Sequence, residues 1–214
     1  MSSDEQPFAD LEATLKKAAA ALRGAGVPFL LGGSLASWAR GGPETRHDLD
    51  LMLKASDVER ALAALTAAGM RPEDPPEEWL VKVWDGDVLV DLIFYPSGLP
   101  IDDDVIARGE NLNVLSMEMR VMAIEDVLIT KLMSMDEHHI RFEGLLPIAR
   151  ALREQIDWRQ VHDATAGSPF ARAFFVLIEG LGVIDEVPAA APPEAPRPRV
   201  RVVTDVGSAA GRVG

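Results

Sequence analysis

The sequence predicts an α+β fold in which helices flank a small sheet and a short helical bundle follows. Short apolar runs bounded by turn residues recur between residues 27 and 94 and indicate strands. Apolar side chains at three- and four-residue steps over 8–22 indicate an amphipathic helix, and helical patterns return between residues 124 and 181. With 214 residues, of which 48% are hydrophobic and 26% charged, the chain is typical of globular proteins with a substantial core.

The first part of the chain alternates helices with strands. Gly24 and Gly26 end the first helix, because glycine readily adopts the backbone conformation that follows a helix. A short apolar run before Gly32 predicts a buried strand, and the alternation of Asp and Leu from Asp48 predicts a second one. In chain order, the predicted elements are a helix over 8–22, a strand over 27–31, a short helix over 34–39 and a strand over 48–53.

Turn and capping residues divide the next part. Ser56 and Glu59 have capping-box spacing, which predicts a helix that begins at Ser56 and that Gly69 ends. Asp85-Gly86 lies between two strand-like runs and is a strong signal for a tight hairpin. The remaining predicted elements are a loop over 71–78, hairpin strands over 79–84 and 87–94, a short strand over 112–115, and helices over 124–135, 145–155 and 170–181.

These patterns predict three regions. Residues 1–120 form the sheet-containing domain, and residues 121–185 form a helical region packed on it. Residues 186–214 are rich in Pro, Ala and Arg and lack the apolar content that offsets chain entropy, which predicts a disordered tail.

Composition excludes several kinds of function. The chain has no cysteine, so disulfides, thiolate zinc sites and a cysteine nucleophile are excluded. The net charge is −13 and no cluster of Lys and Arg stands out, which argues against a broad nucleic-acid groove. No apolar run reaches the roughly 18 residues of a membrane span, and the first residues lack a signal-peptide pattern. We therefore expect a cytoplasmic protein with no membrane partner.

Three short motifs carry the chemistry. The first is Gly32-Gly33-Ser34, which follows a predicted strand and opens a predicted helix. Glycine lets a phosphate group approach the backbone closely, and the Ser34 hydroxyl can donate a hydrogen bond to it. The alternative is an ordinary strand-to-helix turn with Ser34 as the helix N-cap.

The other two motifs are aspartates on strands. Asp48 and Asp50 are two residues apart, so their carboxylates project from the same face of the strand, where they suit a hard divalent cation. Asp91 interrupts an otherwise apolar strand, where burial without a partner is costly. If the two strands are neighbours, three carboxylates converge as in a two-metal site. The alternatives are a solvated face for Asp48 and Asp50 and an exposed hairpin edge for Asp91.

Taken together, these residues resemble the nucleotidyltransferase superfamily that includes DNA polymerase beta. The resemblance covers about residues 27–135 and is greatest to the bacterial stand-alone members, which include abortive-infection toxins and antibiotic-modifying enzymes. A second matching stretch, over 123–132, contains Lys131, whose counterpart faces the active site; the alternative is an exposed helix lysine. Residues 138–144 depart from the pattern of the toxin-like members. The positions that match the superfamily motif are Gly33, Ser34, Asp48, Asp50 and Asp91.

The resemblance implies a small mixed sheet and a metal-dependent transfer reaction. It implies that nucleoside monophosphate passes from a nucleoside triphosphate (NTP) to an acceptor hydroxyl, with release of pyrophosphate. The implied catalytic and metal-binding residues, which would hold Mg²⁺ or Mn²⁺, are Asp48, Asp50 and Asp91. The implied nucleotide-binding residues are Gly32, Gly33, Ser34, Arg46 and Lys131.

The sequence leaves the acceptor open. RNA, a protein hydroxyl and a small molecule such as an aminoglycoside or a lincosamide are all compatible with these motifs. A toxin-like member would also have an antitoxin partner. A different reading is a non-catalytic module that keeps the fold and binds nucleotide.

Overall fold

A computed structural model describes residues 5–44, 49–73, 77–97 and 99–185. Across these residues the chain forms a mixed sheet with the strand order β3-β4-β5-β2-β1-β7-β6. β2 runs parallel to β5 and β1 runs parallel to β7, whereas the other neighbouring pairs are antiparallel. The predicted α+β fold with a small mixed sheet is confirmed. The strands are β1 Phe29–Leu31, β2 Leu49–Leu53, β3 Arg71–Glu73, β4 Leu80–Asp85, β5 Val88–Ile93, β6 Glu110–Val114 and β7 Met117–Val121.

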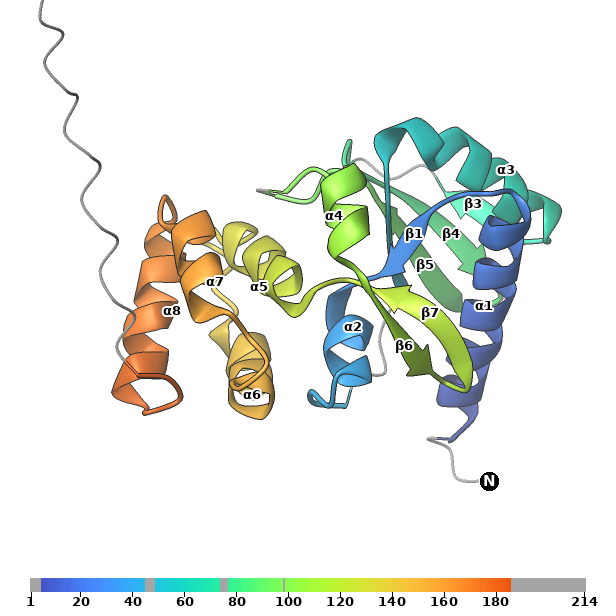
Figure 1. Cartoon of the computed structure of the whole chain (residues 1–214). Coiled ribbons are helices and arrows are strands. Elements are labelled where there is room, and N and C mark those ends of the chain that lie inside the picture. Colours follow the sequence, from blue (N-terminus) through green and yellow to red (C-terminus); the bar gives the residue numbers. More distant parts are fainter. Residues whose placement is uncertain (1–4, 45–48, 74–76, 98, 186–214) are drawn as a thin grey trace, which may run out of the picture.

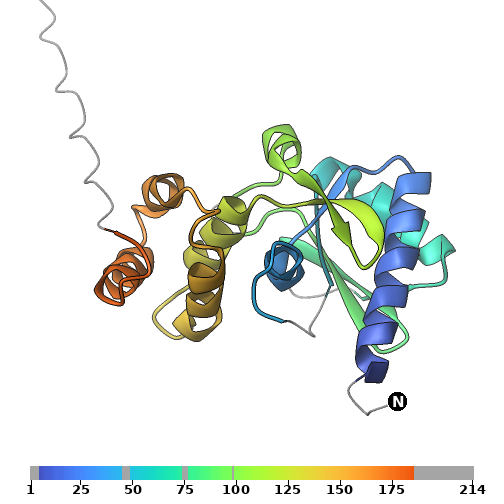
Figure 2. The ribbon, with the colours of Figure 1, turned by 60° about the horizontal axis from the view of Figure 1, so that its bottom comes forward.

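Helices surround the sheet and continue beyond it. Figure 1 shows α1 and α3 beside the sheet at one side of the molecule and α5 to α8 gathered at the other, with α2 between the sheet and the later helices. Figure 2, a second view, shows the same separation. The helices are α1 Glu5–Gly24, α2 Gly33–Ala39, α3 Val58–Ala67, α4 Asp103–Arg108, α5 Ile124–Met133, α6 Phe142–Leu152, α7 Trp158–Thr165 and α8 Pro169–Gly180.

The two faces of the central strands differ in character. Thr14 and Lys17 of α1 bond to the carboxylate of Asp85, so α1 covers the face from which Asp85 projects. Because side chains alternate along a strand, Lys82 of β4 projects from the opposite face. β2 follows the same rule, since Leu49, Leu51 and Leu53 are fully buried on one face while Asp50 and Met52 project from the other. The face away from α1 therefore carries the polar side chains.

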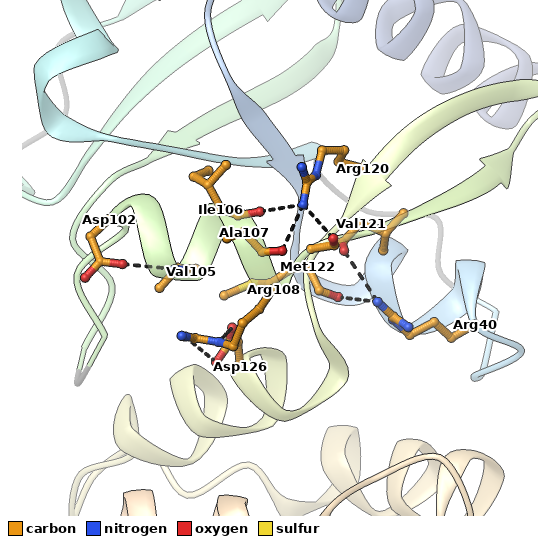
Figure 3. A network of polar contacts seen from close by, with 11 residues as sticks. Arg40, Asp102, Val105, Ile106, Ala107, Arg108, Arg120, Val121, Met122 and Asp126 are labelled. Atoms are coloured by element: carbon orange, nitrogen blue, oxygen red, sulfur yellow. Dashed lines mark hydrogen bonds and ion pairs between the residues drawn. The ribbon is translucent and has the colours of Figure 1, made fainter.

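Arginines hold the junction between the sheet and the later helices (Figure 3). The Arg108 side chain at the end of α4 donates two hydrogen bonds of 3.1 Å to the carboxylate of Asp126 in α5, which is 1% exposed. This carboxylate raises the pKa of Arg108 above its ordinary value. Arg40 donates to the carbonyl oxygens of Val121 and Met122, at 3.4 and 2.9 Å. Arg120 donates to the carbonyls of residues 106, 107 and 109. Arg40 and Arg108 thus hold the segment that leads from β7 into α5, and Arg120 connects β7 with the end of α4.

Some predicted elements differ from the observed ones. The capping box at Ser56 is wrong: residues 55–57 form a short 3₁₀ helix, and α3 begins at Val58 without a side-chain cap. The predicted loop over 71–78 begins with strand β3, which pairs with β4. One strand, β7, and two helices, α4 and α7, were not predicted. No helix of the described ranges is both long and apolar enough to cross a bilayer.

Candidate active site

Two of the three predicted carboxylates lie side by side. β2 and β5 are parallel neighbours, and their register places Asp50 directly opposite Asp91. Residues directly opposite on neighbouring strands project from the same face of the sheet, so both carboxylates occupy the polar face. The structure therefore brings Asp50 and Asp91 together, whereas Asp48 and Arg46 lie outside the described residues.

Gly32 and Gly33 form the wall beside Asp50. The Gly32 N–H donates a 2.8 Å hydrogen bond to the carbonyl oxygen of Asp50. Gly33 has φ +56°, and a Cβ atom there would lie 1.7 Å from Oδ2 of Asp50. A side chain at Gly33 would therefore displace the carboxylate, in addition to the strain of a positive φ. The absence of a side chain at Gly33 thus leaves space for the carboxylate of Asp50.

Ser34 lies one residue further, in the first turn of α2, and is partly exposed. The alternative interpretation, in which Ser34 caps the helix, is wrong because α2 begins at Gly33 and its N-cap is Gly32. Ser34 thus directly follows the glycine that lies against Asp50.

A lysine adjoins the carboxylate pair on its other side. β4 pairs with β5 so that Lys82 lies opposite Asp91, and Lys82 Nζ is 3.3 Å from Asp91 Oδ1. Asp91 is buried, at 9% exposed, and Lys82 is partly buried. The positive charge offsets part of the repulsion between two neighbouring carboxylates. Lys82 was not predicted as a site residue, since only the strand register connects it with Asp91.

The donor set fits a divalent cation. Two adjacent carboxylates supply the oxygen ligands that Mg²⁺ and Mn²⁺ prefer, and Gly33 leaves the Asp50 carboxylate the space it occupies. Within the described ranges, no three His, Cys, Asp or Glu side chains gather closely enough to hold a metal. A third carboxylate would come from Asp48, two residues before Asp50.

A cavity of about 870 Å³ opens near the end of β5. Trp79, which precedes β4, accepts hydrogen bonds at its carbonyl from the N–H groups of Phe94 and Tyr95, at 3.1 and 3.2 Å. Trp79 thus lies three residues beyond Asp91 along the sheet, about 10 Å away. Lys131, near the end of α5, also lines the cavity. The other lining residues are Glu77, Ser134, Met135, Asp136, His139, Arg141, Gly144 and Leu145.

A short loop with a fixed histidine forms part of the cavity wall. Asp136 Oδ1 accepts hydrogen bonds from the N–H groups of His138 and His139 and lies 3.1 Å from Nδ1 of His139. The bond from the His138 N–H, and then the His139 side chain, lower the pKa of Asp136 below its ordinary value. His138 and His139 are both exposed.

Comparison with known proteins identifies the family and the fold. A family model described as "Nucleotidyl transferase of unknown function (DUF2204)" matches residues 11–169. The fold is similar to the crystal structure of ANT(2″)-Ia in complex with adenylyl-2″-tobramycin, with a TM-score of 0.55 and 15% identity over 78% of this chain and 98% of that one. The solution structure of the antibiotic-resistance factor ANT(2″)-Ia gives a TM-score of 0.54 and 17% identity, over 80% and 96%.

A crystal structure of the lincosamide antibiotic adenylyltransferase LnuA with lincomycin bound gives a TM-score of 0.46 and 14% identity, over 65% of this chain and 92% of that one. No curated protein matches the chain in sequence. At these identities, the similarity to ANT(2″)-Ia shows a shared fold.

Proposed function

This chain belongs to the family of nucleotidyl transferases of unknown function, and we propose that it transfers a nucleoside monophosphate from an NTP to a hydroxyl group of a small molecule. The observation that carries this proposal is the register of Asp50 and Asp91, side by side on one sheet face with Gly33 against Asp50. A decayed, non-catalytic module would be free to lose either carboxylate. The pairing therefore supports catalysis over nucleotide binding alone.

Different residues are assigned to metal binding, phosphate binding and proton transfer. Asp50 and Asp91, with Asp48, would hold Mg²⁺ or Mn²⁺, which would neutralise triphosphate charge and make the α-phosphorus more electrophilic. Gly32, Gly33 and Ser34 bind the outgoing phosphates, and Arg46 and Lys131 contribute positive charge. Asp91 orients the acceptor hydroxyl and accepts its proton. The hydroxyl oxygen then bonds to the α-phosphorus as the bond to pyrophosphate breaks.

The cavity supports a small acceptor. Gly33 lies against Asp50, whereas the cavity lies near the end of β5, beyond Asp91, and we infer that the acceptor binds there. A volume of about 870 Å³ suits a drug-sized molecule. Glu77 and Asp136 in its lining could pair with amino groups, although Lys131 and Arg141 balance their charge. The net charge of −13 of the chain favours a cationic acceptor over RNA. An aminoglycoside is thus the first acceptor to test, and a lincosamide the second.

A toxin that acts with an antitoxin partner is a weaker proposal. It would rest on the sequence resemblance alone, and residues 138–144 depart from the toxin-like pattern. In the structure these residues belong to the cavity wall and the first turn of α6.

A labelling experiment tests the proposed function. Each of the four α-³²P-labelled NTPs is incubated with the protein and Mg²⁺ or Mn²⁺, and the acceptors are an aminoglycoside panel, a lincosamide panel, total RNA and a protein lysate. We expect label on a small molecule, and a loss of about 1,000-fold or more in Asp50→Asn and Asp91→Asn, because metal binding and proton transfer are removed.

The matched control is Asp103→Asn, which removes an 86% exposed carboxylate bonded to Lys54 and is expected to retain full transfer. Label on RNA or protein would replace the small-molecule acceptor. If NTP stabilises the protein against heat and no acceptor is labelled, the chain is a nucleotide-binding module and the proposal is wrong.

A further inference from the structure

Four strands carry a row of charges across the polar face of the sheet. Three successive pairings place Glu73 of β3 opposite Lys82 of β4, Lys82 opposite Asp91 of β5, and Asp91 opposite Asp50 of β2. Residues directly opposite one another share a face, so the signs in the row are negative, positive, negative and negative. The lysine is built into the row by strand register rather than placed by a mobile loop.

Lys82 forms an ion pair with Asp91 rather than with Glu73. Its Nζ lies 3.3 Å from Asp91 Oδ1, whereas the Glu73 carboxylate accepts a short hydrogen bond from Nε1 of Trp84. The side chains of Lys82 and Asp91 are 23% and 12% exposed, so water screens this pair less than an exposed pair. Lys82 therefore exerts a substantial field on the carboxylate pair.

A fixed positive charge at this place has two opposite effects. In the metal-free protein it lowers the repulsion between Asp50 and Asp91 and keeps Asp91 in place. Against a divalent cation at the same carboxylates it acts as a competitor, because the ammonium repels the incoming charge and already bonds one ligand oxygen. An NTP brings negative charge of its own, so it reverses this disadvantage when metal and nucleotide arrive together.

We propose that Lys82 is a positioning residue that keeps the metal affinity of the Asp50–Asp91 pair low until the nucleotide is present. This inference rests on the proposed function, since it requires that these carboxylates hold a divalent cation. Lys82 then sets the order of events: the site takes up the metal together with the triphosphate, and the metal-free site stays ordered.

The test measures Mn²⁺ binding to the full chain without nucleotide, from the electron paramagnetic resonance signal of free Mn²⁺. Lys82→Met keeps the aliphatic stem and removes the charge, and we expect it to bind Mn²⁺ about tenfold more tightly than the wild type. Lys82→Arg retains the charge and is expected to stay within about twofold of the wild type. With a non-hydrolysable NTP analogue present, the difference between Lys82→Met and the wild type should shrink.

Lys17→Met is the matched control, because Lys17 forms a comparable ion pair with Asp85 at 2.6 Å on the opposite face of the sheet. It should leave Mn²⁺ binding unchanged. Melting curves supply a second measurement, in which each variant is compared with the wild type at the same Mn²⁺ concentration. Without metal, Lys82→Met, or Lys82→Gln if the Met variant does not fold, should have a lower melting temperature than the wild type, and saturating Mn²⁺ should abolish this difference. The difference between Lys17→Met and the wild type should be the same with and without Mn²⁺.

The outcomes separate this inference from the proposed function. If the wild type binds Mn²⁺ through Asp50 and Asp91 but Lys82→Met binds it equally or more weakly, the inference is overturned while the proposed function stands. If the wild type binds no Mn²⁺ even with the NTP analogue, both are overturned together.

Discussion

Two acid–base pairs of this protein, Lys82–Asp91 and Arg108–Asp126, use similar side chains in different ways. Asp126 is 1% exposed and both its oxygens are taken up by the Arg108 side chain, which matches a carboxylate in shape. Asp91 is contacted by an ammonium at one oxygen and has a second carboxylate beside it in the sheet. The Arg108–Asp126 pair connects α4 with α5, whereas the Lys82–Asp91 pair lies next to a second carboxylate, that of Asp50.

The comparison teaches how to separate structural from functional charges in one chain. A bidentate partner removes the hydrogen-bonding capacity of a carboxylate and leaves a folding role. A carboxylate that adjoins another carboxylate is destabilising by itself and requires a reason, such as a cation to bind. By this criterion, the row at Asp91 serves the reaction and the junction at Asp126 serves the fold.

Gly33→Ala should have the largest effect of the substitutions considered, because it acts on the carboxylate pair of Asp50 and Asp91. The added Cβ would lie 1.7 Å from Asp50 Oδ2, at a φ of +56° that alanine rarely adopts. We expect the free energy of unfolding to fall by about 3 kcal/mol and transfer to fall at least about 100-fold, because the carboxylate must move. Urea unfolding and the labelling assay measure the two effects. Gly24→Ala, where a Cβ meets nothing within 4 Å, should change neither by much, and a fully active Gly33→Ala would remove Asp50 from the site.

Asp126→Ala should have the next largest effect, on stability alone. Removing the carboxylate leaves a buried space and an unpaired Arg108, and we expect a loss of about 2 kcal/mol in the free energy of unfolding. Because Arg108 is partly exposed, water can solvate it and limit the loss. Below the unfolding temperature, transfer per folded molecule should stay within about threefold. A loss of transfer as large as that of Asp91→Asn would show that the junction also serves the reaction.

The smallest effect is expected in the cavity wall, from Asp136. Its pKa is lowered in the folded state, so its stabilising contribution is present above the ordinary pKa of about 3.9 and is lost as pH falls through the lower folded value. A ¹³C NMR titration of the carboxyl group should give a midpoint below the ordinary value. His139→Ala should raise that midpoint, while the bond from the His138 N–H keeps it partly lowered. An unchanged midpoint in His139→Ala would show that the histidine side chain is not held there.

Local chemistry explains which elements were predictable. The β4–β5 hairpin follows from Asp85-Gly86, although the turn lies one residue later than predicted: Asp85 still pairs with Val88, and the two turn residues are Gly86 and Asp87. Gly86 accepts the positive φ, here +60°, of a tight turn. The β6–β7 hairpin turns at Leu115 and Ser116, which have φ of 51° and 63° although neither is glycine or asparagine. A turn of this kind gives no signal in the sequence, so β7 was missed.

The candidate site divides in the same way. Asp50, Asp91 and Gly33 are noticeable by residue type, because carboxylates on apolar strands and paired glycines are unusual. Lys82 is an ordinary strand lysine until β4 is placed in register with β5. Register depends on tertiary pairing, which one strand's sequence does not contain. Whether Asp48 completes the carboxylate set stays a prediction.

The short strand β3 has a consequence for how this protein behaves at high concentration. It forms one edge of the sheet, and an exposed edge invites pairing with a strand from another molecule. Its three residues are Arg71, Pro72 and Glu73, all exposed. Pro72 has no N–H group that could donate a hydrogen bond to a strand of another molecule, and the charged side chains of Arg71 and Glu73 favour contact with water. This edge is therefore guarded against aggregation, and replacing the proline would remove that protection without touching the active site.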